Sequence, residues 1–315
     1  MELIKLMEPI LSTEIIEDND FIHQIKWDGI RGITYIDNYT HKVFTKNGNE
    51  RTDYYPELNE INHLFNGKNG IIDGEIIVLD DNLRPTFNHI LNRERVRNKS
   101  KIKYYANKYP IKYIAFDILF LDGKDLRSYP LEDRIEILHK TLNKSSIITI
   151  TDSFNNGRKL YELMEEKNYE GIVSKNIKSK YIAGKKHDMW YKTKIFKKML
   201  TAIGGIQLGN GKIKSLLLGI YSSEGNIIYI GNGGIGLKES DLNLLKEYMS
   251  VISIDKSPFI NIDKARNVIW VKPILTCWIS FLEWTNTNSL RHPKIIGFSS
   301  KKATEAIGEE YTYRG

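Results

Sequence analysis

The chain has 315 residues, of which 41% are hydrophobic and 27% charged, a composition that is typical of a folded globular protein and excludes a disordered tail. Its formal net charge of +7 favours a polyanionic partner without identifying one. The single cysteine, Cys277, excludes a disulfide framework. No apolar stretch reaches the ~18 residues of a membrane span, and the first residues lack a signal-peptide pattern, so we expect a cytoplasmic protein with no membrane partner.

Short strands and helices alternate through residues 1–195, and this mixture predicts an α+β domain with a largely antiparallel sheet. A chain of this length has room for a second domain. Strand patterns cover residues 21–25, 32–36, 42–45, 71–79, 111–121, 147–150, 169–175 and 190–194. Helix patterns cover residues 56–65, 85–97, 131–142 and 157–167.

Charged and aromatic side chains interrupt these strands. Lys26 lies in a tight link between two strands, where burial and neighbouring cations favour a neutral amine that can attack phosphorus; the alternative is an ordinary surface hairpin. Asp73 and Glu75 share one face of an apolar strand, so they bind something or satisfy buried backbone or a lysine. Considered alone, Phe116 would be expected in the hydrophobic core, and Arg31 would be expected in an ion pair on the surface.

A basic run begins in the predicted helix 85–97 and continues beyond it. The usual interpretation of such a run is a solvated face, but in a basic protein it could also follow a phosphate backbone. Its members are Arg93, Arg95, Arg97, Lys99, Lys101 and Lys103.

The composition changes near residue 195, and the remainder predicts a small β-barrel. Strand patterns at 201–207, 216–221, 227–230, 268–271 and 276–284 are separated by glycine-rich turns, with one helix at 238–250. About five strands with one helix are typical of an OB-fold. Residues 196–315 contain 15 Lys or Arg and 10 Asp or Glu, so this domain carries +5 of the +7 charge and favours a nucleic-acid backbone.

Five motifs follow one another on the strands of the first domain: Lys26-x-Asp-Gly-x-Arg31, Asp73-Gly-Glu75, Phe116-Asp117, Glu170-Gly-Ile-Val-Ser-Lys175 and Lys192-x-Lys194. The ordered set resembles the covalent nucleotidyltransferase superfamily, which includes ATP-dependent DNA ligases, RNA ligases and mRNA capping enzymes. Residues 229–236, 270–273, 281–285 and 290–293 resemble the OB domain of bacterial DNA ligases, and most of all the ligase module of the end-joining enzyme ligase D. The resemblance implies an adenylation domain at 1–195 and an OB-fold domain at 196–315.

The resemblance also implies the chemistry. Lys26 would attack the α-phosphorus of ATP to form lysyl-AMP, AMP would pass to a 5′-phosphate, and a 3′-hydroxyl would then displace it. Further catalytic roles would fall to three cations that meet the ribose, the nick phosphate or the α-phosphate: Arg31, Lys192 and Lys194.

The remaining implied contacts concern ATP, a metal and DNA. Besides these cations, ATP would meet Gln24, Glu75, Phe116 and Ile172, with Phe116 and Ile172 on the two faces of adenine. Mg²⁺ or Mn²⁺ would be held by Glu170 and Glu75. DNA would be held by Lys46, Arg51 and Arg291.

Two motifs depart from the family pattern. Lys46 replaces the arginine of a Ser/Thr-Arg-Asn-Gly motif, and it loses the bidentate fork that suits a phosphate; Arg51 lies near enough to compensate. The last family motif, Arg-x-Asp-Lys, corresponds to residues 297–302, where the arginine and the aspartate are missing. We therefore expect slow self-adenylylation with ATP and a smaller effect on sealing of a pre-adenylylated nick.

These inferences predict an ATP-dependent DNA ligase that seals 5′-phosphate/3′-hydroxyl breaks in duplex DNA, in repair or end joining. The alternatives are an RNA ligase of the same chemistry and a non-catalytic DNA-end-binding protein that kept the fold. We expect a monomer, bacterial or phage-encoded, with nicked or broken duplex DNA as partner and, by family analogy, a Ku-type end-binding protein. The OB domain would move about a hinge near residues 196–200.

Overall fold

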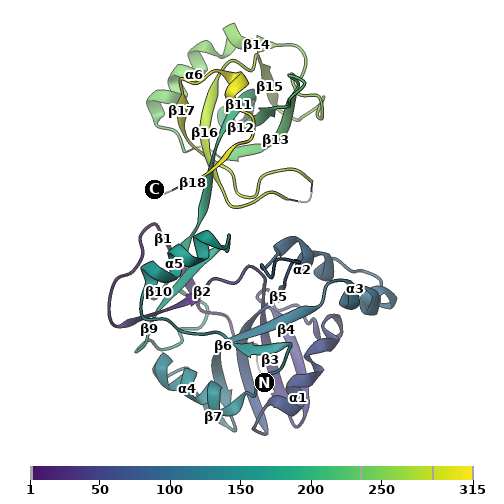
Figure 1. Cartoon of the computed structure of the whole chain (residues 1–315), viewed down its shortest axis with the longest axis vertical. Coiled ribbons are helices and arrows are strands. Elements are labelled where there is room, and N and C mark those ends of the chain that lie inside the picture. The colour runs from purple at the N-terminus through teal and green to yellow at the C-terminus, as the bar shows by residue number, and fades with distance from the viewer. Residues whose placement is uncertain (1–2, 235, 286, 314–315) are drawn as a thin grey trace. The chain divides into compact units, whose positions relative to one another are not determined.

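The computed structural model describes residues 3–234, 236–285 and 287–313, and the chain forms two compact units, Met1–Lys194 and Ile195–Gly315 (Figure 1). The boundary falls between Lys194, the last residue of one strand, and Phe196, the first residue of the next. The expected hinge residues 196–200 therefore form the start of a long strand of the second unit.

The larger sheet of the first unit has the strand order β4-β3-β5-β6-β7, with β8 beside β6. All of its pairings are antiparallel except that of β6 with β8. The central strand β5 is buried on both faces, as its continuous apolar run predicts. The strands are β3 (Ile30–Asp37), β4 (Thr40–Thr45), β5 (Asn69–Val78), β6 (Ile111–Leu121), β7 (Lys124–Asp125) and β8 (Ile148–Ile150).

A smaller sheet of the first unit has the order β1-β10-β9-β2. β2 ends at Ile25 and β3 begins at Ile30, so the Lys26 link joins strands of two different sheets and is no surface hairpin. The backbone N–H of Lys26 donates to Gly171 O at 3.0 Å, which fixes the link against β9. The strands are β1 (Glu8–Ser12), β2 (Phe21–Ile25), β9 (Gly171–Asn176) and β10 (Lys186–Lys194).

Three helices of the first unit, α2, α4 and α5, pack on strands of the sheets with their buried apolar residues. The start of α5 is fixed by a capping residue. The side chain of Asn156 accepts from the Lys159 N–H at 2.9 Å and caps the first turn. The predicted helix 85–97 ends at Glu94, and a second helix follows after a short break. The helices are α1 (Ile61–Leu64), α2 (Phe87–Glu94), α3 (Ile102–Lys108), α4 (Leu131–Thr141) and α5 (Gly157–Glu166), with 3₁₀ turns at Thr52–Tyr54, Pro56–Glu60 and Lys99–Lys101.

The second unit is one curled sheet in the order β12-β13-β17-β16-β11-β15-β14. The long strand β11 also pairs with β12 and β18, and the β11–β12 pairing closes the sheet into a barrel. Its elements are β11 (Phe196–Gly209), β12 (Lys212–Tyr221), β13 (Ile227–Gly234), α6 (Glu239–Ile252), β14 (Ser253–Ile254), β15 (Val268–Val271), β16 (Thr276–Phe281), β17 (Lys294–Ser299), a 3₁₀ turn (Ala303–Glu305) and β18 (Glu310–Tyr313).

This architecture confirms the predicted fold class, an α+β domain with mainly antiparallel sheets followed by an OB-like barrel. The sequence pattern did not predict β18, because its four residues include Tyr311 and Tyr313 between charged neighbours and pair only with the start of β11. Among the described helices, none combines the length and the apolar character needed to span a membrane.

Candidate active site

A pocket of about 320 Å³ lies where the two sheets of the first unit meet. Both sheets contribute to its wall, because β1, β2, β9 and β10 of the smaller sheet and β3, β5 and β6 of the larger sheet each supply a lining residue. The pocket collects seven of the residues that the sequence predicts for the site: Gln24, Lys26, Arg31, Lys46, Glu75, Phe116 and Lys192.

Lys26 lies beside Glu170 at one side of the pocket. Glu170 accepts a hydrogen bond from the ammonium of Lys26 through one oxygen and binds Lys194 Nζ through the other at 2.8 Å. Burial by itself would raise the pKa of Glu170, but the two ammonium groups outweigh it and hold that pKa below its usual range. The carboxylate therefore stays ionised and positions both lysines.

Gly171 explains how Glu170 can point at Lys26. Its φ is +138°, and a Cβ at this position would lie 2.1 Å from Thr193 O. Only glycine fits a backbone that turns this way and passes so close to a neighbouring strand. In the fourth motif, Gly171 thus provides the backbone conformation that lets Glu170 bind the lysines.

Lys192 and Lys194 lie on the same face of β10, as their spacing predicts. Lys192 lines the pocket, opposite Val173 in the ladder. Burial, together with the charges of Lys26 and Lys194, lowers the pKa of Lys192. Lys194 and Glu170 do not line the pocket, but Glu170 binds both Lys194 and Lys26, so three ammonium groups lie near this side, where they would attract a phosphate chain.

Arg31 enters the pocket wall from β3 and is held by Asp73. Its guanidinium donates to the two oxygens of Asp73 at 2.8 and 2.5 Å and to Met7 O at 2.7 Å. Burial disfavours the charge of Arg31, but the Asp73 carboxylate outweighs this, so the pKa of Arg31 lies above its usual range. Asp73 also accepts from the Tyr181 hydroxyl at 2.9 Å. Asp73 therefore satisfies an arginine, not the lysine or backbone that the sequence suggested.

Glu75 is the carboxyl group of the pocket that lacks a cationic partner. Among the described residues it forms no ion pair, and it lines the pocket two residues beyond Asp73 on β5. Burial raises the pKa of Glu75 to about 8, although Lys26 and Arg31 oppose the shift. A bound cation or a hydroxyl donor would stabilise the ionised form of this buried carboxyl group.

The residues also fit a divalent ion. No cluster of three or more His, Cys, Asp or Glu side chains suited to a metal occurs in the part of the chain that the structure describes. Mg²⁺ needs no such cluster, because it is usually held by one or two carboxylates, phosphate oxygens and water. Glu75 fits this requirement directly, whereas Glu170 already has a lysine on each oxygen.

Phe116 and Val173 belong to the apolar lining of the pocket, together with Pro9, Ile25, Trp27 and Trp190. Ile172, which the resemblance placed on a face of adenine, is fully buried and does not line the pocket. Successive residues of a strand point to opposite faces, so its neighbour Val173 takes the pocket position. The expectation for Ile172 is therefore replaced by Val173.

Lys175 is a pocket residue whose role the sequence did not suggest. It shares a face of β9 with Val173, is 3% exposed, and lies with Nζ 4.3 Å from the ring centroids of both Phe116 and Trp190. Burial lowers the pKa of Lys175 to about 7, although Asp117 and Asp73 oppose the shift. The signal that could have revealed it was its position two residues beyond Val173 on a strand that borders the site.

The predicted residues Gln24 and Lys46 lie at the pocket. Gln24 is buried and its side-chain amide donates to Ser153 Oγ at 3.1 Å, so its side chain is already held in place. Lys46 is half exposed and binds Glu8 at 2.7 Å. The hydrogen bond from Lys46 lowers the pKa of Glu8. Lys46 and Glu8 together form a polar rim.

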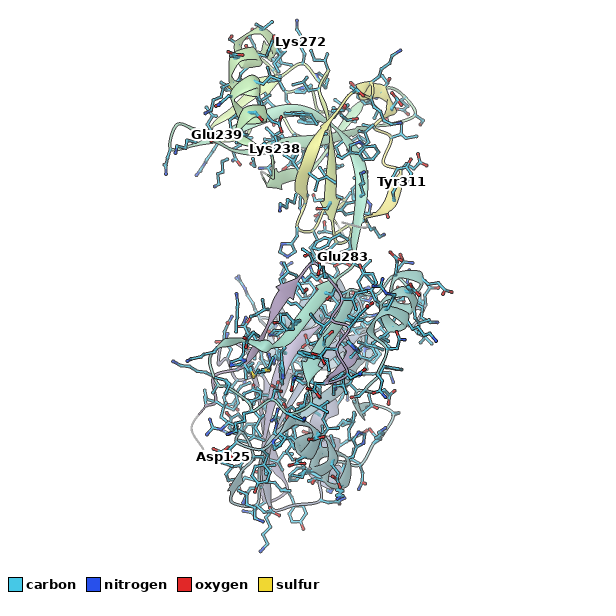
Figure 2. The ribbon with its side chains drawn as sticks, turned by 90° about the vertical axis from the view of Figure 1, so that its left-hand side faces the viewer. Asp125, Lys238, Glu239, Lys272, Glu283 and Tyr311 are labelled. Carbon is cyan, nitrogen blue, oxygen red and sulfur yellow. The ribbon has the colours of Figure 1, made fainter. Side chains whose placement is uncertain are left out.

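Arg51 does not line this pocket. Arg51 binds Glu94 at 3.0 Å and lies over the Tyr54 ring. Arg291, in the second unit, binds Glu283 at 2.7 Å, and Glu283 is labelled in Figure 2. Both arginines must exchange or share a carboxylate partner before they can bind a phosphate.

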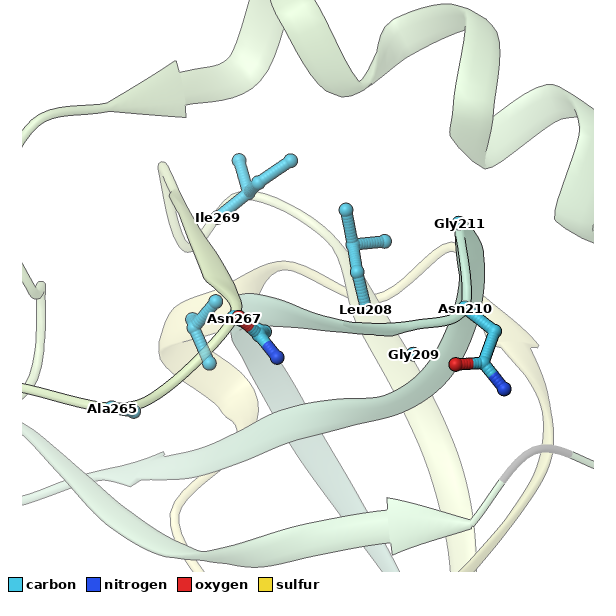
Figure 3. A pocket seen from close by; sticks show the side chains of 8 residues that line it. Leu208, Gly209, Asn210, Gly211, Ala265, Asn267 and Ile269 are labelled. Atoms are coloured by element: carbon cyan, nitrogen blue, oxygen red, sulfur yellow. The ribbon is translucent and has the colours of Figure 1, made fainter.

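The second unit has a wider depression of about 470 Å³ between the β11–β12 turn and β15. Figure 3 shows Leu208, Asn210 and Asn267 around it. Its lining contains no ionisable side chain, so it offers no group that could neutralise a phosphate.

The altered final motif lies at the end of β17. Residues 297–299 belong to the strand, and Lys301 binds Glu305 at 3.2 Å. The backbone N–H of Lys302 donates to the same carboxylate at 2.8 Å. Glu305 thus holds this segment in a local turn, where the family has an arginine and an aspartate.

Comparison with known proteins agrees with this arrangement. The family model described as ATP dependent DNA ligase domain matches residues 4–194, and the model described as ATP dependent DNA ligase C terminal region matches residues 209–302. The multifunctional non-homologous end joining protein LigD of Mycolicibacterium smegmatis is 30% identical over 290 residues, which cover 90% of this chain and 36% of the relative. The DNA ligase of Methanococcus aeolicus is 29% identical and covers 98% of this chain and 57% of the relative.

Solved structures show the same similarity. The structure of mycobacterial DNA ligase D complexed with ATP and MES is 26% identical, has a TM-score of 0.55, and covers 97% of this chain and 98% of the other. The chain spans only about a third of the length of the LigD relatives, 37% for the protein from Mycobacterium tuberculosis, so it corresponds to their ligase module. Because the two family models cover most of its residues, the chain belongs to the ATP-dependent DNA ligase family, as the order of its motifs predicts.

Proposed function

We propose that this protein seals 5′-phosphate/3′-hydroxyl breaks in duplex DNA through a covalent AMP adduct on Lys26. The observation that carries the proposal is the position of Lys26 at a pocket that is also lined by Lys192, Arg31, the Glu75 carboxyl group and the Phe116 ring, with Lys194 joined to Lys26 through Glu170. Each of these groups meets one demand of adenylyl transfer from ATP.

The proposed reaction has three balanced steps. Lys26 Nζ loses a proton and attacks the α-phosphorus of ATP, so that a P–N bond forms and the bond to pyrophosphate breaks. An oxygen of the DNA 5′-phosphate then attacks the same phosphorus, and the P–N bond breaks with return of a proton to Lys26. In the last step the 3′-hydroxyl attacks the 5′-phosphorus, the phosphodiester forms and AMP leaves.

The cations of the pocket would stabilise charge on the transferring group. Lys192 and Lys194 project from one face of β10 towards the side where Lys26 lies, and such groups act most strongly in a pocket that excludes water. Arg31 is oriented in advance by its bidentate contact with Asp73, so little conformational freedom is lost when it binds the ribose or the nick phosphate.

A divalent ion, Mg²⁺ or Mn²⁺, would be held by Glu75 and Glu170. It would neutralise charge on the phosphates of ATP. Lys26 loses its positive charge when it becomes lysyl-AMP, which weakens its contact with Glu170 and makes one carboxylate oxygen available. Adenine would lie between Phe116 and Val173, with Gln24 at its edge.

The proposal extends to DNA and to the division of the chain. Lys46, Arg51 and Arg291 would contact phosphates of the break, and residues 1–195 and 196–315 would act as adenylation and OB-fold domains that move about residues 196–200. The relatives named as end-joining proteins support a role in repair. A Ku-type partner is proposed by family analogy alone. Loss of the arginine and aspartate near residues 299–302 would slow the first step more than the later ones.

The decisive experiment incubates the protein with labelled ATP, Mg²⁺ and nicked duplex DNA, and follows adduct and sealed product together. The expected result is that Lys26→Ala removes both, whereas Lys140→Ala, which alters an exposed ion pair on α4, leaves both unchanged. DNA-end binding without an adduct at any pH or metal would support the non-catalytic alternative. Sealing of nicked RNA but not nicked DNA would support the RNA ligase alternative.

A further inference from the structure

The strongest unassigned feature outside the pocket is the basic surface around α2 and α3. Residues 93–112 contain eight Lys or Arg and a single acidic residue, Glu94. We define the α2–α3 tract as the six exposed cations of this segment: Arg95, Arg97, Lys99, Lys101, Lys103 and Lys108.

The contacts of this segment separate a structural arginine from the exposed cations. Arg93 is buried and donates to Glu57 and to two backbone carbonyls, so it belongs to the core. Glu94 is engaged by Arg51 and by the Tyr55 hydroxyl. The only acidic residue of the segment therefore does not neutralise the tract.

Most of the tract has no acidic partner. Lys99 binds Asp53 at 2.8 Å, and Lys108 lies over the rings of Tyr104 and Tyr109. Among the described residues, the other four cations form no ion pair: Arg95, Arg97, Lys101 and Lys103. Four uncompensated cations within nine residues create a local positive potential that a polyanion would neutralise.

The tract is connected to the pocket through the surface of β4. Lys46 lies at the pocket rim, and the backbone N–H of Arg51 donates to Val43 O, which places Arg51 alongside β4. Arg51 then binds Glu94, the last residue of α2 and the neighbour of Arg95. Lys46 and Arg51, each paired with a carboxylate, thus lie between the rim of the pocket and the tract.

We propose that the α2–α3 tract binds the phosphate backbone of the duplex beside the break, so that DNA is held well beyond the nick itself. This inference rests on the proposed function, since it names where the same substrate continues on the protein. Flexible lysines and arginines on α3 and on the segment that joins it to α2 suit phosphates and carry no base readout, so the contact is independent of sequence. Apart from Tyr104, the segment exposes no large apolar side chain, which argues against insertion into a lipid surface.

The test uses the full chain with four substitutions, Arg95→Ala, Arg97→Ala, Lys101→Ala and Lys103→Ala. Binding to a nicked duplex is measured by fluorescence anisotropy across a series of salt concentrations. Because each neutralised phosphate contributes about −0.9 to the slope of log K against log salt, loss of four such contacts should reduce the magnitude of the slope by about 3.6 and weaken binding at least ~10-fold at low salt. Formation of the Lys26 adduct from ATP should be unchanged.

The matched control makes the same change of charge elsewhere in the first unit, with Lys124→Ala, Lys140→Ala, Lys144→Ala and Lys167→Ala, all of them exposed. This control should keep the slope and the affinity. A second variant, Arg95→Lys with Arg97→Lys, keeps the charge and should also bind as the unaltered protein does.

Two results with DNA would overturn the inference: an unchanged slope in the tract variant, or an equal loss of DNA affinity in the control. Binding to vesicles that contain phosphatidylserine is measured in parallel, and a tract variant that loses affinity for these vesicles but not for DNA would also overturn it. Failure of the proposed function is distinguishable, because it would appear as absence of the Lys26 adduct in the unaltered protein, whatever its affinity for DNA.

Discussion

Two arginine–aspartate pairs lie side by side in the larger sheet of the first unit, and only one of them faces the pocket. Asp73 on β5 and Asp117 on β6 stand opposite each other in the ladder. Arg31 binds Asp73 and lines the pocket, with 13% of its side chain exposed. Arg134, from α4, binds Asp117, and both side chains are fully buried.

The two pairs differ in the exposure of the arginine more than in its hydrogen bonds. Arg134 makes two bonds to Asp117 at 2.7 and 2.9 Å, and its Nη1 donates to the carbonyls of Tyr129 and Ser179. Arg31 has similar bonds to Asp73 and also donates to Met7 O and to the Tyr181 hydroxyl, but its side chain is partly exposed to the pocket beside Phe116. The same chemical pair is thus structural in one place and available to a ligand in the other.

The largest expected effect concerns the buried pair. Arg134→Ala leaves the Asp117 carboxylate buried without its cation, so the free energy of unfolding should fall by about 3–5 kcal/mol. Urea denaturation measures this change. The matched control is Arg127→Ala, which breaks the exposed pair with Asp125 (labelled in Figure 2) and should cost no more than about 1 kcal/mol. Equal losses for the two variants would contradict a structural role for the core pair.

The second prediction concerns Arg31→Lys. Lysine keeps the charge but loses the two-pronged contact with Asp73, so the sealing rate should fall on the order of 10- to 100-fold, because the cation is misplaced. The stability loss should be about 1–2 kcal/mol, because Tyr181 still donates to Asp73. Single-turnover sealing and urea denaturation measure the two effects. Arg134→Lys should show the reverse balance, and a larger stability loss for Arg31→Lys would contradict the comparison.

The third prediction uses the unpaired carboxyl group of the pocket. The pKa of Glu75 is about 8 in the folded protein against an ordinary value of 4.5, so between these pH values the folded state holds a proton that the unfolded state has released. Stability contributed by this proton is present below pH 4.5 and is lost as the pH rises to about 8. Glu75→Gln should therefore flatten the decline in the free energy of unfolding between pH 5 and pH 8. If Glu75→Gln leaves the pH dependence of the free energy of unfolding unchanged, the raised pKa of Glu75 is excluded.

The smallest expected effect concerns Lys175. Its pKa is about 7 in the folded protein against an ordinary value of 10.5, so the unfolded state holds the extra proton between these values. Stability should rise with pH across this window, and the cost of the buried charge is complete below pH 7. Lys175→Met removes the charge and keeps an apolar contact with Phe116 and Trp190. Its gain in thermal stability over the unaltered protein should be largest at pH 7 or below and should vanish near pH 10.5; a constant difference would contradict this.

Local patterns predicted much of the site. The spacing of Lys192 and Lys194 placed both on one face of a strand, and the structure has them there. The Lys26 link was expected between two strands, although not between strands of different sheets. Ile172 was expected in the pocket where Val173 lies, because alternation along a strand indicates which residues share a face but not which face meets the pocket.

The amino-acid sequence by itself determined the order of the motifs, the family, the α+β class and the barrel, because the periodicity of apolar residues and the spacing of charges are local properties. Only the tertiary structure decided the partners: Asp73 with Arg31, Asp117 with Arg134, Arg51 with Glu94, and Glu75 with none among the described residues. These choices depend on which segments, distant in the chain, are brought within hydrogen-bonding distance. Burial then sets the cost of each charge, and so distinguishes the groups that stabilise the fold from those that await a ligand.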